Sequence, residues 1–435
     1  MIGVARRNPR FARLWSAQVV SQTGDWFNRV AVIALLAKLA GPSAAVGVGL
    51  SFGLEMAVRM LPTAFMSPFA GTLADRFSRK GLMIGCDLAR IPIVLCYLTV
   101  DEPSEVGRLY LLLALQMGLG ICFDAARQGA LPNTVGRDDL HDALALSSVT
   151  WSMMLSIGAL VGGAAIGPLG IAGVFVVDAC TYAVSASLLA GLRLPTAPPH
   201  PTPFRWIDLL TLREARLGLV HVRERRILAA LATKALWGPA GAFLVMVSVA
   251  ASVRFGLGDN GLPDPARIGP AFGLLFAARG VGTAIGPILG RYAVGRGRTA
   301  MLQQIAIGFV IAAIGYALFA FAQGLWLAAL CVVLAHVGGG AIWVASTSFW
   351  QQSVDDRFRG RVHALDFLGM TVSFSVFALL GGLVYDASQS IELTMACGLG
   401  ALALCATTWF LATRPIAREL ATAPVAGAAG ASDRN

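Results

Sequence analysis

Long apolar segments alternate along this chain with short polar connections that are rich in glycine or arginine. A bilayer core about 30 Å thick needs roughly 20 apolar residues in a helix, and the apolar segments have that length. The pattern predicts twelve transmembrane helices, at 11–37, 43–70, 82–100, 108–126, 140–168, 172–193, 228–253, 268–290, 300–321, 325–350, 362–385 and 391–413. We therefore expect an all-α membrane protein.

The two halves of the chain resemble each other in sequence. Residues 71–79 recur in weaker form at 290–298, an offset of 219 residues. At the same offset, and without a gap, 135–163 match 354–382. Two separate stretches at one offset of about half the chain length indicate two homologous halves. Parallel repeats of about six helices each are a transporter architecture, so we expect two six-helix bundles.

Composition supports a membrane location, and the charges predict an orientation. The chain is 56% hydrophobic and 13% charged, with a mean hydropathy of +0.70, which is not typical of a soluble domain. Most of the 34 Lys and Arg residues lie in loops on the side of the N-terminus. The loops on the other side hold Lys38, Arg108, Arg254 and Arg267. Positive loops stay inside, so we expect both termini in the cytoplasm, with the protein in a bacterial inner membrane.

The domain boundaries follow from the repeat. We expect one bundle at 1–193 and a second at 228–414, joined by a cytoplasmic linker at 194–227. The linker begins proline-rich and continues with the charged stretch Arg205–Arg226, which also carries Leu, Ile and Val. This stretch is expected to be an amphipathic helix on the membrane surface, or simply a tether between the bundles. Residues 415–435, rich in Ala and Gly, are expected to form a disordered cytoplasmic tail.

The loop between the second and third predicted spans reads Gly-Thr-Leu-Ala-Asp-Arg-Phe-Ser-Arg-Lys, from Gly71 to Lys80. It resembles the loop of the major facilitator superfamily, Gly-x-x-x-Asp-Arg-x-Gly-Arg-Lys, with Ser78 in place of the second glycine. Asp87-Leu-Ala-Arg90 and Asp124-x-x-Arg127-Gln128 are similar to the drug:proton antiporter branch that includes macrolide and siderophore exporters. The resemblance implies the major facilitator fold. It also implies proton-coupled efflux of amphipathic small molecules by alternating access.

The same resemblance implies a conformational latch, made of Gly71, Asp75, Arg76, Arg79, Asp124 and Arg127. Asp75 would lie against the N-terminus of helix 11, where the helix dipole favours a carboxylate. Arg79 would reach Asp124. These contacts would hold the two halves together on the cytoplasmic side and stabilise an outward-open state. The alternative is that this is only a basic loop that sets the topology.

Charged residues within the predicted spans are candidates for coupling, because each is costly inside a membrane. The candidates for proton coupling or substrate contact are Asp25, Arg29, Glu55, Arg59, Asp178 and Asp366. Asp25 and Arg29 are four residues apart, so they are expected to share a helix face and could neutralise each other. Glu55 and Arg59 repeat that spacing. Burial favours a neutral carboxylic acid and a nearby arginine favours the carboxylate, so helix movement could load and release a proton.

Several buried acids have a structural alternative. Asp87 and Asp366 lie near the predicted cytoplasmic helix ends and could form structural ion pairs. Asp178 could be an acid whose hydrogen bonds are satisfied in helix packing. Asp25 and Glu55 are therefore our first choices as proton carriers.

No catalytic centre, cofactor or metal site is predicted. The sequence has no phosphate-binding loop for ATP and no His/Cys/Asp cluster with metal spacing. The +10 net charge is dispersed over short loops, so it does not indicate nucleic-acid binding. We expect a monomer that is not an enzyme, whose partners are an amphipathic small molecule, protons and membrane lipids. The alternatives are a flippase for lysophospholipids or other lipids, and a membrane sensor that does not transport.

Overall fold

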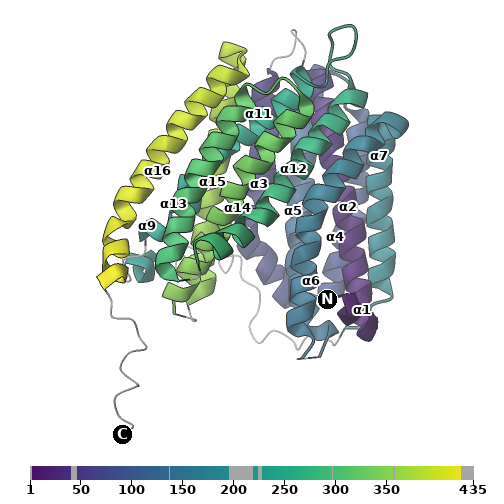
Figure 1. The fold of residues 1–435 in the computed structure, drawn as a ribbon. Helices are drawn as coiled ribbons and strands as arrows, with labels where there is room; N and C mark the ends of the chain where they lie inside the picture. Colours follow the sequence, from purple (N-terminus) through teal and green to yellow (C-terminus); the bar gives the residue numbers. More distant parts are fainter. Residues whose placement is uncertain are drawn as a thin grey trace.

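The computed structural model describes residues 2–40, 47–136, 138–194, 219–223, 228–295, 297–355 and 358–422. Within these ranges the chain is built from helices, and the only bridge of β type joins Leu257 to Pro263 (Figure 1). The expected all-α fold is confirmed. The linker residues 195–218 and 224–227, and the last residues from 423 onward, lie outside the described ranges.

The first half runs from α1 to α7. Its helices are α1 (Ile2–Arg7), α2 (Pro9–Leu39), α3 (Val48–Arg76), α4 (Arg79–Cys96), α5 (Val106–Ala130), α6 (Leu140–Met153) and α7 (Ala159–Ala190). A π-helical turn, Met154–Gly158, joins α6 to α7. Inside α7, Gly170 has a φ of +67° and follows Pro168 by two residues. Only glycine adopts this conformation readily, and the break separates the two spans expected at 140–168 and 172–193.

The second half runs from α9 to α16. Its helices are α9 (Leu228–Leu231), α10 (Thr233–Leu236), α11 (Ala240–Val253), α12 (Pro265–Ala293), α13 (Arg298–Ala320), α14 (Leu325–Ser353), α15 (Arg359–Ser388) and α16 (Ile391–Thr422). The span expected at 228–253 is thus divided, and Gly238 and Pro239 interrupt it before α11. The tail expected to be disordered from 415 is helical as far as Thr422, because α16 continues through Pro415.

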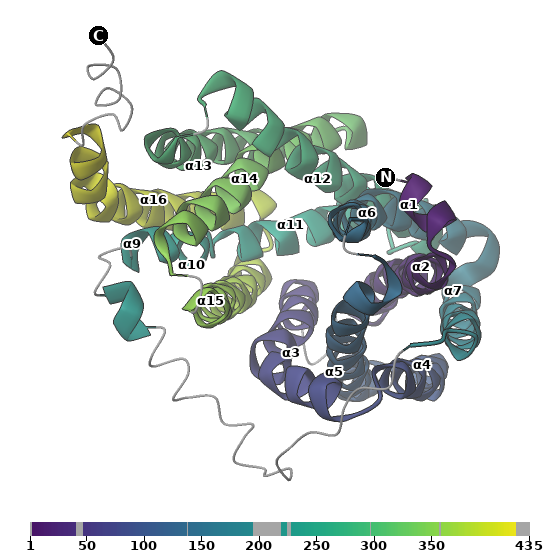
Figure 2. The same cartoon turned by 90° about the horizontal axis from the view of Figure 1, so that it is seen from below.

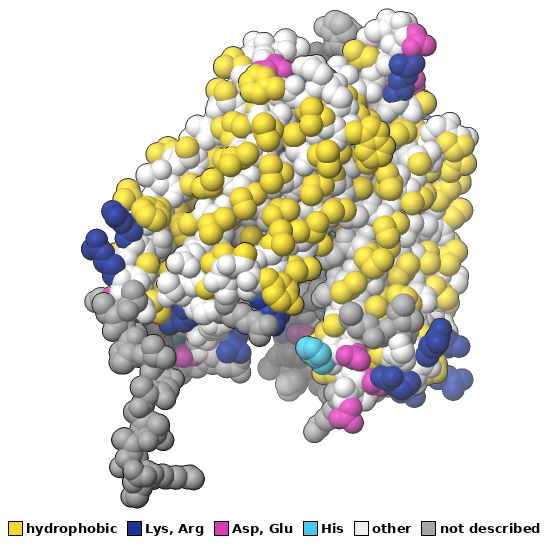
Figure 3. Space-filling model, in the orientation of Figure 1, with side chains coloured by type: hydrophobic (Ala, Val, Ile, Leu, Met, Phe, Trp, Pro, Cys, Tyr) yellow, Lys and Arg dark blue, Asp and Glu magenta, His cyan; other side chains and the backbone are white. Residues whose placement is uncertain are grey.

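Helix length and exposure support a membrane-spanning protein. Eight helical segments in the described residues are long and apolar enough to cross a bilayer, and α11 is a shorter apolar helix. The two long helices α2 and α3 fall outside that criterion. Large apolar side chains such as Leu111, Leu330 and Leu404 are 60–69% exposed. In Figure 3 a broad hydrophobic band covers the middle of the surface, and most Lys and Arg side chains lie below it.

We name each end of the molecule after an acidic residue that lies there. α3 begins beside Asp386, near the end of α15, and it ends at Asp75 and Arg76. We call the upper end in Figure 1 the Asp386 end, and the lower end, which holds α1, the Asp75 end.

The hydrophobic core shows that the halves are joined unevenly. One large cluster contains residues of both halves, from Phe27 to Trp409. A second cluster lies entirely within the first half and includes Ala70, Ala74 and Phe123. A third lies within the described residues 222–365 and includes Trp350. Since Ala70 and Ala74 belong to the last turns of α3, the halves have separate cores toward the Asp75 end.

Two seams join the halves. α3 packs on α15, and α7 packs on α12 (Figure 2). Small residues allow the helices to approach closely: a Cβ added at Gly49 would lie 2.5 Å from the carbonyl oxygen of Gly382. Likewise, a Cβ at Gly273 would lie 2.6 Å from the carbonyl oxygen of Ala159. Side chains larger than hydrogen would force these backbones apart.

Candidate functional site

A cavity of about 1050 Å³ lies between the halves. Its wall is formed by α2, α3, α4 and α5 of the first half and by α15 of the second. Ser67 and Gln128, which are exposed, line its outer part, and Asp25 and Arg29 line it at greater depth. Because Ser67 and Gln128 lie in the second halves of α3 and α5, the cavity opens toward the Asp75 end.

The opposite end of the cavity is closed by contacts between the halves. Asp386 accepts a hydrogen bond from the backbone N–H of Gly49 at 2.8 Å and another from Leu50 at 2.8 Å. These N–H groups belong to the first turn of α3, which has no acceptors of its own for them. The helix dipole favours the negative charge at this position. The sequence reasoning missed Asp386, because it falls one residue outside the expected span 362–385 and resembles an ordinary loop acid.

Asp25 is held by α4 and α7, not by its own helix. The Tyr182 hydroxyl donates to Asp25 Oδ1 at 2.6 Å, and Arg90 Nη1 lies 3.6 Å from the same oxygen. Arg90 also pairs with the buried Asp87. The expected Asp25–Arg29 pair is therefore wrong: the four-residue spacing permits it, but the two side chains point to different neighbouring helices.

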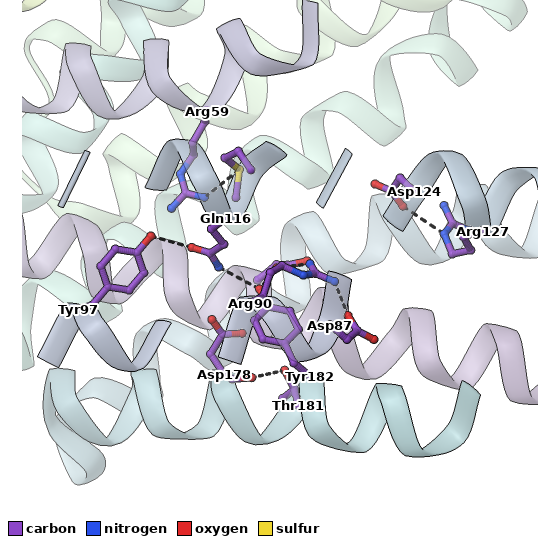
Figure 4. A network of polar contacts seen from close by, with 12 residues as sticks. Arg59, Asp87, Arg90, Tyr97, Gln116, Asp124, Arg127, Asp178, Thr181 and Tyr182 are labelled. Atoms are coloured by element: carbon purple, nitrogen blue, oxygen red, sulfur yellow. Dashed lines mark hydrogen bonds and ion pairs between the residues drawn. The ribbon is translucent and has the colours of Figure 1, made fainter. Parts of the chain in front are cut away.

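A chain of hydrogen bonds continues from Tyr182, the hydrogen-bond donor to Asp25, through the first half (Figure 4). Gln116 Nε2 donates to the Tyr182 hydroxyl at 2.9 Å, and the Tyr97 hydroxyl donates to Gln116 Oε1 at 2.8 Å. Arg90 lies over the Tyr182 ring at 4.2 Å. All of these side chains except Asp25 are buried. The chain links the cavity wall to the end of α4, on the side of the Asp386 end.

Asp178 is placed differently from Asp25. Its side chain is fully buried, and neither carboxyl oxygen has a hydrogen-bond partner among the described residues. It lies against α2 at Gly24, where an added Cβ would overlap it. A carboxylate that is buried without hydrogen bonds is strongly unfavourable. Asp178 is thus not satisfied in helix packing here.

Glu55 forms the centre of a three-residue cluster. Arg59 donates to it along α3, as the spacing predicts. Arg29 of α2 approaches the same carboxylate, with Nε 3.7 Å from Oε1. Glu55 is 2% exposed, and both arginines line the cavity. One carboxylate therefore faces two guanidinium groups.

Asp366 lies in the second half in a buried pair. Lys234 Nζ is 2.5 Å from Asp366 Oδ2, and the Trp350 indole donates to the same oxygen at 3.2 Å. Lys234 also lies 4.7 Å from the centre of the Trp343 ring. Asp366 does not line the cavity. This arrangement agrees with the structural-pair alternative that the sequence left open.

The expected latch is not assembled in this conformation. Asp75 is 69% exposed, and among the described residues it forms an ion pair with Arg79 at 3.8 Å and not a contact with the start of α15. Arg79 Nη1 donates to the carbonyl oxygen of Gly129 at 2.6 Å, so it does not reach Asp124. Gly71 has open space around it, and Arg76 ends α3.

Asp124 pairs within its own helix. Arg127 Nε lies 3.2 Å from Asp124 Oδ1, and its Nη1 donates to Gln18 and Ser147 at 2.9 Å each. Arg127 therefore ties α5 to α2 and α6 inside the first half. This role requires no partner from the second half.

Comparison with known proteins identifies relatives along nearly the whole chain. The profile of the family described as "Transmembrane secretion effector" matches residues 5–426. An MFS-type transporter of Bacillus subtilis, YkuC, is 22% identical over 389 residues, 86% of this chain and 83% of its own. The enterobactin exporter EntS of Escherichia coli is 26% identical over 396 residues, 88% of this chain and 87% of its own. The B. subtilis MFS-type transporter YfiS is 31% identical over only 40% of each chain.

Solved structures show the same fold. A bacterial homologue of the human lysosomal transporter Spinster, in an inward-facing and unoccupied conformation, has a TM-score of 0.71 at 15% identity. The alignment covers 94% of this chain and 98% of that one. The nucleoside transporter NupG has a TM-score of 0.68 at 13% identity, over 93% and 99% of the two chains. At such identities the likeness shows the fold alone.

Proposed function

This chain belongs to the transmembrane secretion effector family of MFS-type transporters, and we propose that it exports amphipathic small molecules in exchange for protons. It acts as a monomer in a bacterial inner membrane, by alternating access. Membership of the family rests on a profile match over residues 5–426. Export is suggested by the relative EntS, an enterobactin exporter. The proposals for the coupling ion and for the substrate class are based on the residues that line the cavity and on its size.

The observation that carries the proposal is that the two halves are joined at one end of the cavity and have separate cores at the other. Asp386 and the glycine-lined seams close one end, while separate cores leave the Asp75 end open. Rocking of the halves would exchange the two arrangements and move the cavity to the other side of the membrane. The cavity volume of about 1050 Å³ is at the upper end of the range for small-molecule sites.

The proposed orientation places the Asp75 end in the cytoplasm. The loops at that end carry most of the basic residues, and the excess of positive charge remains inside. The conformation described here would then be the inward-open state, ready to load substrate from the cytoplasm. Asp75 and the following loop would close this end in the outward-open state.

Asp25 is the proposed proton carrier. It lines the cavity and is 34% exposed, so water from the open end can reach it. Arg90 and Tyr182 favour its charged form in this state. Movement of α2 against α4 would separate Asp25 from Arg90 and favour proton uptake. Glu55, held between Arg29 and Arg59, is the second candidate.

Transport by the purified protein in proteoliposomes tests this proposal. A panel of amphipathic dyes, both anionic and cationic, is loaded with and without an imposed pH gradient. We expect at least one dye to move against its gradient, at a rate that follows the pH gradient. Dye flux indifferent to pH would refute proton coupling. Phospholipid flipping without dye movement would instead support a flippase, and no flux of either kind would support a sensor.

A further inference from the structure

Arginines outnumber acids among the residues that line the cavity. Its wall includes four arginines and two acids, namely Arg29, Arg59, Arg90, Arg361, Asp25 and Asp124. Both acids already have cationic neighbours: Arg90 lies 3.6 Å from Asp25, and Arg127 lies 3.2 Å from Asp124. A cationic solute would have to compete with these arginines for the carboxylates. The wall therefore offers a cation no unpaired acid.

Arg29 is the least satisfied of the cavity arginines whose contacts are described. Its Nε is 3.7 Å from Glu55, beyond hydrogen-bond distance, and this carboxylate is already bonded to Arg59. Its Nη2 contacts the sulfur of Met56 at 3.6 Å, which is a weak acceptor. Nε has no hydrogen-bond partner among the described residues. The cluster of two arginines and one glutamate thus keeps one positive charge without a matching carboxylate.

Aromatic rings hold this guanidinium in place. The Arg29 guanidinium carbon lies 4.9 Å from the Phe276 ring centre and 5.4 Å from the Trp26 ring. Both distances are within the range of cation–π attraction. Trp26 also lines the cavity, and Phe367 lines it from the second half. A fixed, partly desolvated guanidinium beside aromatic surface suits a solute that joins an acidic group to an apolar ring system.

Arg90 differs from Arg29 in this respect. It lies between Asp25 and Asp87, so one guanidinium faces two carboxylates. Its neighbourhood is the electrostatic opposite of the Glu55 cluster. An anion is therefore expected at Arg29 and not at Arg90.

We propose that the cavity takes anionic amphipathic solutes, with Arg29 as the residue that binds their acidic group. This inference rests on the proposed function of the same cavity. The acidic group would accept hydrogen bonds from the guanidinium, and the apolar part would lie against Trp26 and Phe367. Cationic amphipathic solutes would be disfavoured.

Two permanently charged probes with one ring system test the sign of the preference. Binding of naphthalene-2-sulfonate and of trimethyl(2-naphthylmethyl)ammonium to the detergent-purified full chain is measured by calorimetry, with empty micelles as the blank. We expect the sulfonate to bind at least about tenfold more tightly, the effect of roughly one charge-assisted hydrogen bond. Equal binding, or tighter binding of the ammonium probe, would overturn the inference.

Variants locate the site. Arg29→Gln should weaken sulfonate binding about tenfold and leave the ammonium probe unchanged. Glu55→Gln should tighten sulfonate binding, because it removes the negative charge of the cluster. Arg267→Gln, at the exposed Asp386 end, is the control and should change neither. Opposite effects at Arg29 and Glu55 are not expected of residues that only support packing, so parallel losses in both variants would refute the site.

Two further measurements distinguish a variant that fails to fold, a wrong inference about the anion and a wrong proposed function. If Arg29→Gln does not elute as a folded species, Arg29→Lys keeps the charge and should keep the preference for the sulfonate. Flux of both probes in proteoliposomes distinguishes this inference from the proposed function. Transport of the ammonium probe alone would refute anion selectivity and leave export standing, whereas transport of neither would count against both.

Discussion

Asp386 and Gly49 belong to different halves of the protein, and the carboxylate of the first accepts the backbone N–H of the second at 2.8 Å. The same carboxylate also accepts the N–H of Leu50. An acid at the end of α15 thereby caps the start of α3. The family resemblance places Asp75, at the end of α3, against the start of α15. In both contacts a carboxylate would lie at the N-terminus of a helix from the other half. The contacts would form at opposite ends of the molecule, and each would favour one conformation.

The first prediction concerns Asp386. Asp386→Asn removes the charge and half of the acceptors, so the Asp386 end should open more often. A loss of about 1–2 kcal/mol would shift the equilibrium roughly five- to thirtyfold. Spin labels at Ser104, between α4 and α5, and at Leu262, between α11 and α12, report the separation of the halves at this end by pulsed electron paramagnetic resonance. Asp259→Asn, whose side chain is 93% exposed, is the control. An unchanged distance distribution in Asp386→Asn would show that the seams alone close this end.

The second prediction concerns Asp75. In this conformation its side chain is 69% exposed, and among the described residues its ion pair is with Arg79. Asp75→Asn should therefore leave folding and the melting temperature unchanged while slowing transport, because only the opposite conformation uses the charge. Flux and thermal stability are measured on the same preparation. Full activity in this variant would mean that the loop only sets topology.

The third prediction concerns coupling. Asp25→Asn should still bind and exchange substrate but should not concentrate it against a gradient, because the residue can no longer release a proton. Counterflow and pH-driven uptake in proteoliposomes distinguish the two activities. Glu55→Gln is the comparison for the second candidate. If a protein with both Asp25→Asn and Glu55→Gln still concentrates substrate in response to a pH gradient, the proton carrier must be sought at Asp178.

The fourth prediction concerns the Lys234–Asp366 pair. Because Lys234 and Asp366 are 2% and 1% exposed, loss of one partner leaves a buried, unpaired charge. Asp366→Ala should lower the free energy of unfolding by about 3–5 kcal/mol, and Lys234→Met with Asp366→Leu should recover much of it. Thermal unfolding in detergent measures both. An Asp366→Ala protein of normal stability without pH-driven transport would instead identify a coupling residue.

The fifth prediction concerns orientation. A cysteine at position 260, in the loop before α12, should react with an impermeant thiol reagent added outside intact cells. A cysteine at position 200 should react only after the cells are opened. Both are introduced into a background lacking the seven native cysteines, all of which are free. Reversed labelling would place the Asp75 end outside and exclude the proposed direction of loading.

Several features could be predicted from the sequence because their causes are local along the chain. The length of each apolar segment is tied to the bilayer thickness, so most of the expected helices coincide with helices between α2 and α16, although the span at 228–253 is divided among α9, α10 and α11. The break between the spans at 140–168 and 172–193 coincides with Gly170, whose left-handed backbone favours glycine. The Glu55–Arg59 pair follows from four-residue spacing on one helix.

Other features required the tertiary structure, because they depend on which helices are neighbours. Spacing suggested that Arg29 would neutralise Asp25, yet the fold brings Glu55 of α3 to Arg29 and Arg90 of α4 to Asp25. The ion-pair partner of Asp366 is Lys234, which lies 132 residues away in the sequence. A sequence identifies which buried charges need partners, but not which distant side chain supplies them.

The sequence by itself determined the membrane fold, the two related halves and the set of buried charges, since the hydropathy, the internal repeat and the positions of charged residues can be read directly from it. The tertiary structure alone decided which end of the cavity is closed. That closure depends on Asp386 meeting the start of α3 across 337 residues of chain, and on glycines that let two backbones touch. Such contacts exist only when the halves are docked at that end, so they belong to one conformation and not to the chain as such.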